Sequence, residues 1–235
     1  MATDEPPTVV HALLAALAAR PDQPLMTFYD DATGERAELS AATLANWVAK
    51  TANMLVDGLG LQPGDAAAVR LPPHWQTAAV VLGCWVAGLT VDSTAVTPAP
   101  IAFVAPPVPE PLPPADEVYA LALAPLGMPF RPGPPPGTLD FVVEVRPYGD
   151  RLPRVATDPA GLAFADGPTH ADLATAAAGR GVPSDARVLI DADTDPDPVS
   201  WLVAPLLARS SVVLCRNLDA TKLASRLATE HAVRI

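Results

Sequence analysis

Short apolar segments with the length of β-strands alternate with longer segments of helical periodicity along this chain. Residues 66–71 are apolar except for Arg70, and residues 211–215 form a second apolar run that ends in Cys215. Strands that are apolar on both faces are typical of a parallel sheet covered on both sides. Segments 9–20 and 74–88 have the spacing of helices. The alternation predicts a three-layer α/β fold, with a mostly parallel sheet and helices on both faces.

The same reading places elements along the rest of the chain. Further strands are expected at 25–29, 36–39, 89–91, 101–104, 139–146 and 186–190, and further helices at 40–57, 116–124, 169–179, 199–208 and 220–231. Prolines are dense in residues 97–115 and 129–136, where we expect stiff, extended connectors. We therefore expect a single domain over residues 1–235, built from two α/β halves at about 1–137 and 138–235.

The bulk composition bears on the class of partner. The 235 residues are 50% hydrophobic and carry a net charge of −11, so they can bury a substantial core but offer no overall basic surface. Nucleic acids and anionic membranes both require such a surface, and we expect neither as a partner. The first seven residues lack the basic region of a signal peptide, and no segment has 18 unbroken apolar residues. These features favour a soluble, cytoplasmic protein.

The cysteines and histidines give no pattern of a metal or catalytic site. Cys84 and Cys215 each lie in an apolar run, so we expect two buried thiols rather than a disulfide or metal pair. The histidines are isolated in sequence, with no pair spaced as i and i+4: His11, His74, His170 and His231. His170 is expected at a helix start, where it bonds to the backbone, since a catalytic role needs an adjacent nucleophile.

The remaining candidates are a run of acidic residues, two serines and the tryptophans. Acidic residues alternate at Asp191, Asp193, Asp195 and Asp197. Clustered carboxylates suit Ca²⁺ or Mg²⁺, but the segment lacks the glycine and final glutamate of a calcium loop, which favours a solvated turn. Ser93 and Ser200 do not lie in a nucleophile elbow and receive no role. The four tryptophans are expected in or at the edge of the core: Trp47, Trp75, Trp85 and Trp201.

Four sequence blocks occur in a characteristic order. They are Leu-Ser-Ala-Ala-Thr-Leu at 39–44, Leu-Gln-Pro-Gly-Asp at 61–65, Gly-Cys-Trp-Val-Ala-Gly at 83–88 and Val-Pro-Ser-Asp-Ala-Arg-Val-Leu-Ile at 182–190. Together they resemble the acyl- and aryl-CoA synthetase superfamily of adenylate-forming, AMP-binding enzymes. They are similar above all to the short members of that superfamily found in actinobacteria. The resemblance implies part of the N-terminal domain of such an enzyme.

The chain departs from that family between Thr157 and Leu173. The family has a Ser/Thr/Gly-rich phosphate loop that ends in Pro-Lys-Gly, followed by a Thr-His-x-x-Leu helix start. Residues 169–173 match the helix start, but the preceding segment keeps only Gly161 and Gly167 and has no lysine. A phosphate loop works because freed backbone N–H groups, a lysine and hydroxyls converge on the triphosphate. Asp166 would repel phosphates instead.

The resemblance and the departure together favour a protein without the ancestral chemistry. The sequence also ends before the segments that would supply the family's adenine site, its ribose-binding aspartate and its mobile C-terminal domain. We therefore expect a non-catalytic homologue that acts as a binding, scaffolding or regulatory protein, with no catalytic, cofactor-binding or metal-binding residue assigned. The expected partner is another protein or a second copy of the chain. The alternatives are half of a split synthetase, completed by another polypeptide, and a small-molecule binder that keeps part of an acyl pocket.

Overall fold

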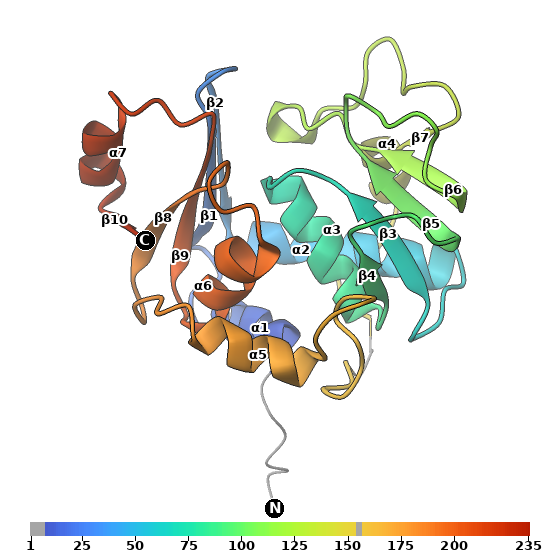
Figure 1. Ribbon diagram of the computed structural model, residues 1–235, viewed down its shortest axis with the longest axis horizontal. Helices are drawn as coiled ribbons and strands as arrows, with labels where there is room; N and C mark the ends of the chain where they lie inside the picture. Colours follow the sequence, from blue (N-terminus) through green and yellow to red (C-terminus); the bar gives the residue numbers. More distant parts are fainter. Residues whose placement is uncertain (1–7, 154–156) are drawn as a thin grey trace, which may run out of the picture. The chain divides into compact units, whose positions relative to one another are not determined.

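The computed structural model describes residues 8–153 and 157–235 (Figure 1). The first seven residues, on which the expectation about a signal peptide rested, lie outside that part. Within it, ten strands form two five-stranded sheets. The contacts group the chain into two compact units: unit 1 holds residues up to 44, 73–75 and 171–235, and unit 2 holds 45–72 and 76–170. Each unit is assembled from segments far apart in sequence.

Unit 1 is built on a sheet in the order β10-β8-β9-β1-β2. All neighbours pair in parallel except β1 and β2, which form the hairpin expected from the sequence. Helix α7 lies on one face of this sheet, and α1 and α6 lie on the other (Figure 1). The elements are α1 Val9–Ala19, β1 Pro24–Asp30, β2 Glu35–Ser40, β8 Arg187–Asp191, α6 Ala204–Leu207, β9 Ser211–Arg216, α7 Leu223–Glu230 and β10 Val233–Arg234.

Local capping explains where the helices of unit 1 begin. The hydroxyl of Thr8 accepts a hydrogen bond from the His11 amide, and the His11 ring accepts one from the Thr8 amide. This reciprocal capping box fixes the start of α1 and gives His11 a structural role. Ser40 caps the next helix, α2 (Ala41–Asn53), by accepting from the Thr43 amide at 3.2 Å. Both starts were expected from the sequence.

Unit 2 is built on an all-parallel sheet in the order β4-β3-β5-β6-β7. Helix α2 continues into this unit and packs against α3. A Cβ atom on Gly83 would lie 2.6 Å from the side chain of Thr51, so only glycine permits this helix contact. Gly88 follows α3 with φ +78, which requires glycine at the turn into β4. The elements are β3 Ala66–Arg70, α3 Trp75–Val86, β4 Thr90–Asp92, β5 Ala99–Val104, β6 Ala115–Ala120 and β7 Leu139–Asp140.

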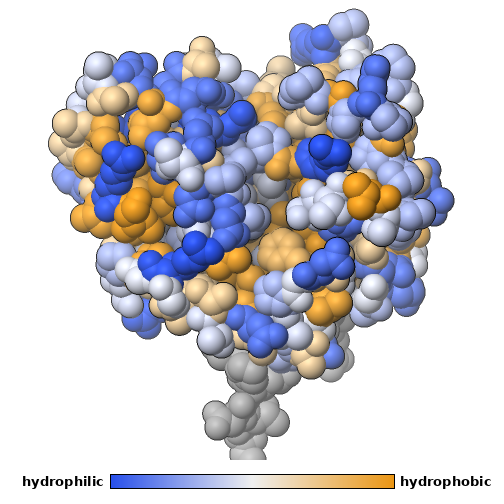
Figure 2. Space-filling view, in the orientation of Figure 1, coloured by the Kyte–Doolittle hydropathy of each residue, from blue (hydrophilic) through white to orange (hydrophobic). Residues whose placement is uncertain are grey.

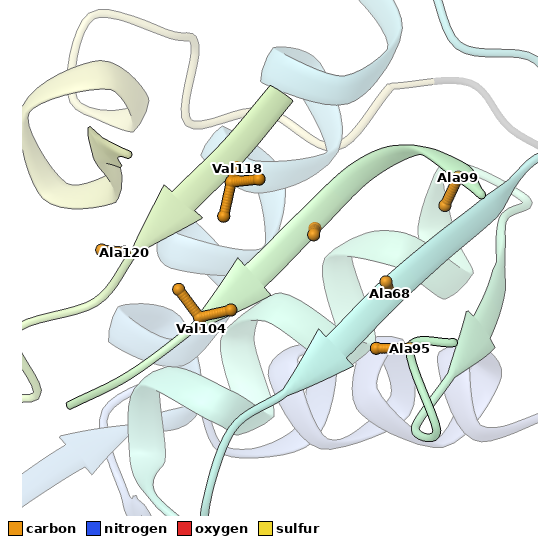
Figure 3. Packing of buried hydrophobic residues seen from close by; sticks show 7 residues of the cluster. Ala68, Ala95, Ala99, Val104, Val118 and Ala120 are labelled. Atoms are coloured by element: carbon orange, nitrogen blue, oxygen red, sulfur yellow. The ribbon is translucent and has the colours of Figure 1, made fainter. Parts of the chain in front are cut away.

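One face of the unit 2 sheet is lined by small side chains (Figure 3). The buried cluster is Ala68, Ala95, Ala99, Ala102, Val104, Val118 and Ala120. Val108, Leu112 and Phe130 pack against it, and all three come from the proline-rich parts of the chain. The proline-rich segments therefore do more than connect elements, because they supply the apolar cover of this face.

Two predicted elements are wrong. Residues 116–124 were expected to be helical, but β6 is a strand that pairs in parallel with β5, which places Val118 and Ala120 in the buried cluster. Residues 139–146 were expected to be a strand, but the strand stops at Asp140. That carboxylate accepts the amides of Val142 and Val143 and so begins helix α4 (Phe141–Val145).

Two predicted helices are confirmed but locally altered. The segment after α2 continues as one π-helical turn at Met54–Gly58, and residues 199–203 form a second π-helical turn before α6. No helix in the described part of the chain is both long and apolar enough to cross a membrane.

Candidate functional site

The segment 157–170 is the part of the sequence that departs from the family's phosphate loop. It pairs with the edge strand β4. The Val91 amide donates to the carbonyl of Ala163 at 3.1 Å, and the Ala165 amide donates to the carbonyl of Val91 at 3.0 Å. Phe164 thereby forms a parallel bridge with Val91. The segment covers a sheet edge that would otherwise present unpaired backbone groups.

The same segment also folds back on itself. Leu162 and Thr169 form an antiparallel bridge. The Ala163 amide donates to Pro168 at 3.0 Å, the His170 amide to Gly161 at 3.0 Å, and the Gly167 amide to Phe164 at 3.1 Å. Each of these N–H groups therefore already has a backbone acceptor.

Trp85 anchors the segment from α3. Its indole Nε1 donates to the carbonyl of Ala163 at 2.9 Å. The indole ring makes edge contacts with Phe164 and His170, each with centroids 5.6 Å apart. Trp85 and Ala163 are completely buried. A buried indole N–H needs an acceptor, and this carbonyl supplies it, so the backbone at Ala163 is held in place by side-chain packing.

His170 is the one histidine of the matched helix start, and it is buried beside Trp85. It begins helix α5 (His170–Ala178) and is 3% exposed. Burial lowers its pKa to about 4, so the imidazole is neutral at pH 7. Within the described residues its Nδ1 has no hydrogen-bond partner. Its backbone N–H donates to the carbonyl of Gly161, and its ring packs in the core against Trp85.

Unit 1 holds a cavity of about 910 Å³. It lies beside the first residues of the parallel strands, because Pro24, Arg187 and Ser211 line it and each begins a strand. The carboxyl end of α7 contributes Glu230 and His231. The volume is typical of a small-molecule site. The space-filling view shows apolar and hydrophilic side chains side by side over α7 and the carboxyl end of the chain (Figure 2).

Charged groups form the floor of this cavity. Glu230 is 5% exposed at its side chain and accepts hydrogen bonds from Tyr29, from Arg187 at 2.5 Å, and from Arg36 at 3.1 Å. Burial alone would raise the pKa of Glu230, but these three donors outweigh it and hold the pKa at about 2. Burial and the Glu230 acceptor raise the pKa of Tyr29 in turn. The floor is therefore a fixed, ionised network.

A second ionic group lies on the same side of the sheet. Asp31 accepts from Arg226 at 2.7 Å and 3.0 Å, and both side chains are less than 10% exposed. Hydrogen bonds from Arg226 hold the pKa of Asp31 well below its usual range. The Arg226 guanidinium also lies 4.1 Å from the Tyr29 ring centroid. This ion pair links α7 to the residue after β1. It is separate from the Glu230 network that forms the cavity floor.

The cysteines and His74 lie apart from both regions, whereas His231 lines the cavity. Cys84 and Cys215 are buried free thiols, as expected. Burial raises the pKa of Cys84 to about 12 and that of Cys215 to about 11, so neither is a reactive thiolate. His74 is buried in unit 1 against the Phe28 ring, at 4.3 Å between centroids, and burial lowers its pKa. His231 caps α7 in a left-handed conformation.

The acidic loop after β8 uses its carboxylates locally. Asp191 pairs with Arg234 at 3.8 Å, Asp193 accepts from the Asn217 amide, and Asp197 pairs with Arg180 at 2.5 Å. In the described ranges, 8–153 and 157–235, no three acidic, histidine or cysteine side chains are grouped to hold a metal ion.

The serine and tryptophan candidates are also placed. Ser200 is buried and Ser93 exposed, and neither lies in the two regions described above. Trp75, Trp85 and Trp201 are buried and Trp47 is half-buried, as expected for core and core-edge residues.

The cavity could not be predicted from local sequence patterns. Its floor joins Tyr29 and Arg36 of the hairpin to Arg187 and Glu230, which lie more than 150 residues further along the chain. One local signal was present: Arg36 and Glu38 alternate with Ala37 and Leu39, which marks a strand with one charged face. That pattern alone did not identify the partners of those charges.

Known proteins resemble this chain in sequence and in fold. The AMP-binding enzyme family matches residues 13–94. A TIGR03089 family protein of Mycobacterium tuberculosis is 41% identical over 248 residues, with 98% of each chain covered.

Solved structures share the fold. An acyl-CoA synthetase of Brucella canis superposes with a TM-score of 0.75 at 16% identity, over 98% of this chain and 47% of that one. The N-terminal domain of FACL13 from Mycobacterium tuberculosis gives 0.70 at 13%, over 96% and 61%. Acetoacetyl-CoA synthetase from Streptomyces lividans gives 0.70 at 18%, over 95% and 41%.

The chain thus spans roughly half the length of these solved synthetases. Its two α/β sheets correspond to part of an acyl-CoA synthetase N-terminal domain, as the sequence resemblance implied. The match to the mycobacterial relative over 98% of each chain shows the family: the chain belongs to the TIGR03089 family.

Proposed function

We propose that this protein is a non-catalytic relative of the adenylate-forming enzymes that acts by binding, as a scaffolding or regulatory protein. One observation carries the proposal. The amides of Gly161, Ala163, Ala165 and Gly167 all donate to acceptors within the chain. A phosphate site needs converging amides that are free to donate, because an N–H that is already bonded cannot neutralise a triphosphate.

The side chains of the segment support the same proposal. Leu162, Ala163 and Phe164 are apolar, and Asp166 is exposed and negatively charged. Adenylate transfer needs cations and donors aimed at the charge that develops on phosphorus. No lysine or arginine lies between residues 157 and 170. Electrostatic stabilisation of the reaction would have to come from groups outside this segment.

The test measures nucleotide binding and turnover separately. Titration calorimetry with Mg-ATP and with AMP, at nucleotide concentrations up to several millimolar, is expected to give no binding heat. Exchange of radiolabelled pyrophosphate into ATP, with a panel of aliphatic and aromatic carboxylic acids, is expected to stay at background. Micromolar ATP binding or acid-dependent exchange by the purified chain would overturn the proposal.

A second candidate function, binding of a small molecule, is favoured by the cavity of unit 1. The cavity has the volume of a ligand site and an ordered polar floor. It belongs to unit 1, whereas the segment 157–170 belongs to unit 2, so the two functions rest on separate residues.

A further inference from the structure

The lining of the unit 1 cavity includes apolar side chains besides its ionic floor. Ala15, Ala16 and Ala19 of α1 line it, together with Pro24 and Leu25 at the start of β1. Ala15 and Ala19 are exposed and Ala16 is half-exposed, so these methyl groups are open to the cavity rather than packed in the core. A lining with both an apolar part and a charged part fits a ligand that has an apolar body and one polar end.

The charges that line the cavity favour an anion. Four arginines (Arg20, Arg36, Arg187 and Arg209) stand against three carboxylates (Glu38, Asp185 and Glu230), which leaves a local charge of +1. The whole chain carries −11. A net positive concave site on a negative protein attracts anions locally while the rest of the surface repels them.

The hydrogen bonds of the cavity floor also favour an anionic ligand. The buried carboxylate of Glu230 already accepts from Tyr29, Arg36 and Arg187. Arg36 uses Nε and Nη2 in its hydrogen bonds, and its Nη1 donates to no group in the described part of the chain. The Arg36 side chain is 46% exposed. The floor thus offers spare donors on a guanidinium but no spare buried acceptor.

The location sets this cavity apart from the usual ligand position of the fold. Ligands of open α/β sheets bind outside the carboxyl ends of the strands. Here the lining includes the first residues of β1, β8 and β9 and extends to Tyr29 and its partner Arg36, so the cavity runs along the sheet from the amino ends of these strands.

We propose that the unit 1 cavity binds an amphipathic organic anion, with its carboxylate or phosphate at Arg36 and its apolar body against the alanines of α1. The inference rests on the proposed function that this protein acts by binding. It adds the chemical class of the ligand and the residues that recognise it.

The test uses four probes with one tail: octanoate, octyl phosphate, octylamine and octanol, titrated into the full chain below their micelle concentrations. Inorganic phosphate and acetate report binding of the head group alone. We expect both anionic probes to bind at least tenfold more tightly than octylamine and octanol, and the tail-free anions to bind weakly. Octanoate against octyl phosphate decides which head group is preferred.

Two variants locate the binding. Arg36→Gln is expected to weaken the anionic probes about tenfold, because a charge-assisted hydrogen bond is lost. Ala16→Phe fills the apolar part of the lining and is expected to weaken every probe that binds. Ala18→Phe is the matched control: Ala18 is an exposed residue of the same helix outside the cavity lining, and its variant should bind as wild type. Thermal melting checks that each variant is folded.

Several results would overturn this inference. They are no binding of any probe at millimolar concentration, equal binding of charged and neutral probes, or wild-type binding by Ala16→Phe. Dimerisation that Ala16→Phe abolishes, without probe binding, would assign the cavity to a second copy instead. None of these outcomes involves ATP, so the inference can fail while the proposal of a non-catalytic protein stands.

Discussion

The segment 157–170 in unit 2 and the cavity in unit 1 differ in whether their hydrogen-bond donors already have acceptors. In the segment, the amides of Ala163, Ala165 and Gly167 are all bonded to backbone carbonyls, and Leu162 and Phe164 place apolar side chains along it. In the cavity, Arg36 keeps donors that face open space. The two regions thus differ in whether their donors are already bonded, because each depends on its own local structure.

The largest expected effect concerns Trp85, which anchors the segment 157–170. Trp85→Ala should destabilise the protein by about 4 kcal/mol, since it removes a completely buried indole that packs on Phe164 and His170. Trp85→Phe keeps most of the packing and removes the donor to Ala163, so it should cost about 1.5 kcal/mol. Urea unfolding measures both. A loss below 1 kcal/mol for Trp85→Ala would show that the segment does not depend on this anchor.

The next prediction uses the buried histidine of the same segment. The pKa of His170 is lowered from 6.5 to about 4 by burial. The unfolded chain therefore binds a proton that the folded chain does not, and stability falls as the pH falls from about 6.5 to about 4. The loss should approach 3 kcal/mol. His170→Phe should flatten this part of the pH profile, measured by unfolding at a series of pH values. An unchanged slope would mean that the pKa of His170 is the same in the folded and the unfolded protein.

A smaller effect is expected at the cavity floor. Glu230→Gln should cost about 2 kcal/mol, because hydrogen bonds to a charged acceptor are replaced by weaker ones. The pKa of Glu230 is lowered from 4.5 to about 2, so this advantage of the wild type is complete above pH 4.5 and is lost as the pH falls through 2. Glu38→Gln is the control: its side chain is 35% exposed, and we expect less than about 0.5 kcal/mol. Equal effects of the two substitutions would argue against a fixed ionic floor.

The smallest effect sharpens the account of the closed segment. Asp166 is exposed, so Asp166→Lys should change stability by less than about 0.5 kcal/mol. It supplies a cation within the segment 157–170, yet we expect no ATP binding by calorimetry, because the neighbouring amides stay bonded to backbone carbonyls. Submillimolar ATP binding by this variant would show that the missing lysine, rather than the backbone pairing, excludes phosphate.

The sequence predicted local features well and distant pairings poorly. Apolar runs gave β3 and β9, and Thr8 and Ser40 gave helix starts, because those signals lie within a few residues. The strand at 115–120 was missed because its pairing with β5, rather than its local sequence, makes it a strand. Residues 141–145 were predicted to be a strand, but the Asp140 side chain begins a helix there.

The candidate regions divide in the same way. The loss of the phosphate-loop residues between 157 and 167 was visible in the sequence. The pairing of Ala163 and Ala165 with Val91 was not, since those partners lie more than 70 residues apart. The cavity floor, which joins Arg36 to Glu230, was likewise beyond local patterns.

The most direct test of the central claim is amide-resolved NMR of residues 157–170 with and without Mg-ATP. If the segment is closed, the Ala163 and Ala165 amides should be protected from hydrogen exchange in the free protein. Neither their protection nor their chemical shifts should change with nucleotide. Rapid exchange of these two amides in the free protein, together with shifts that saturate on addition of ATP, would contradict the account.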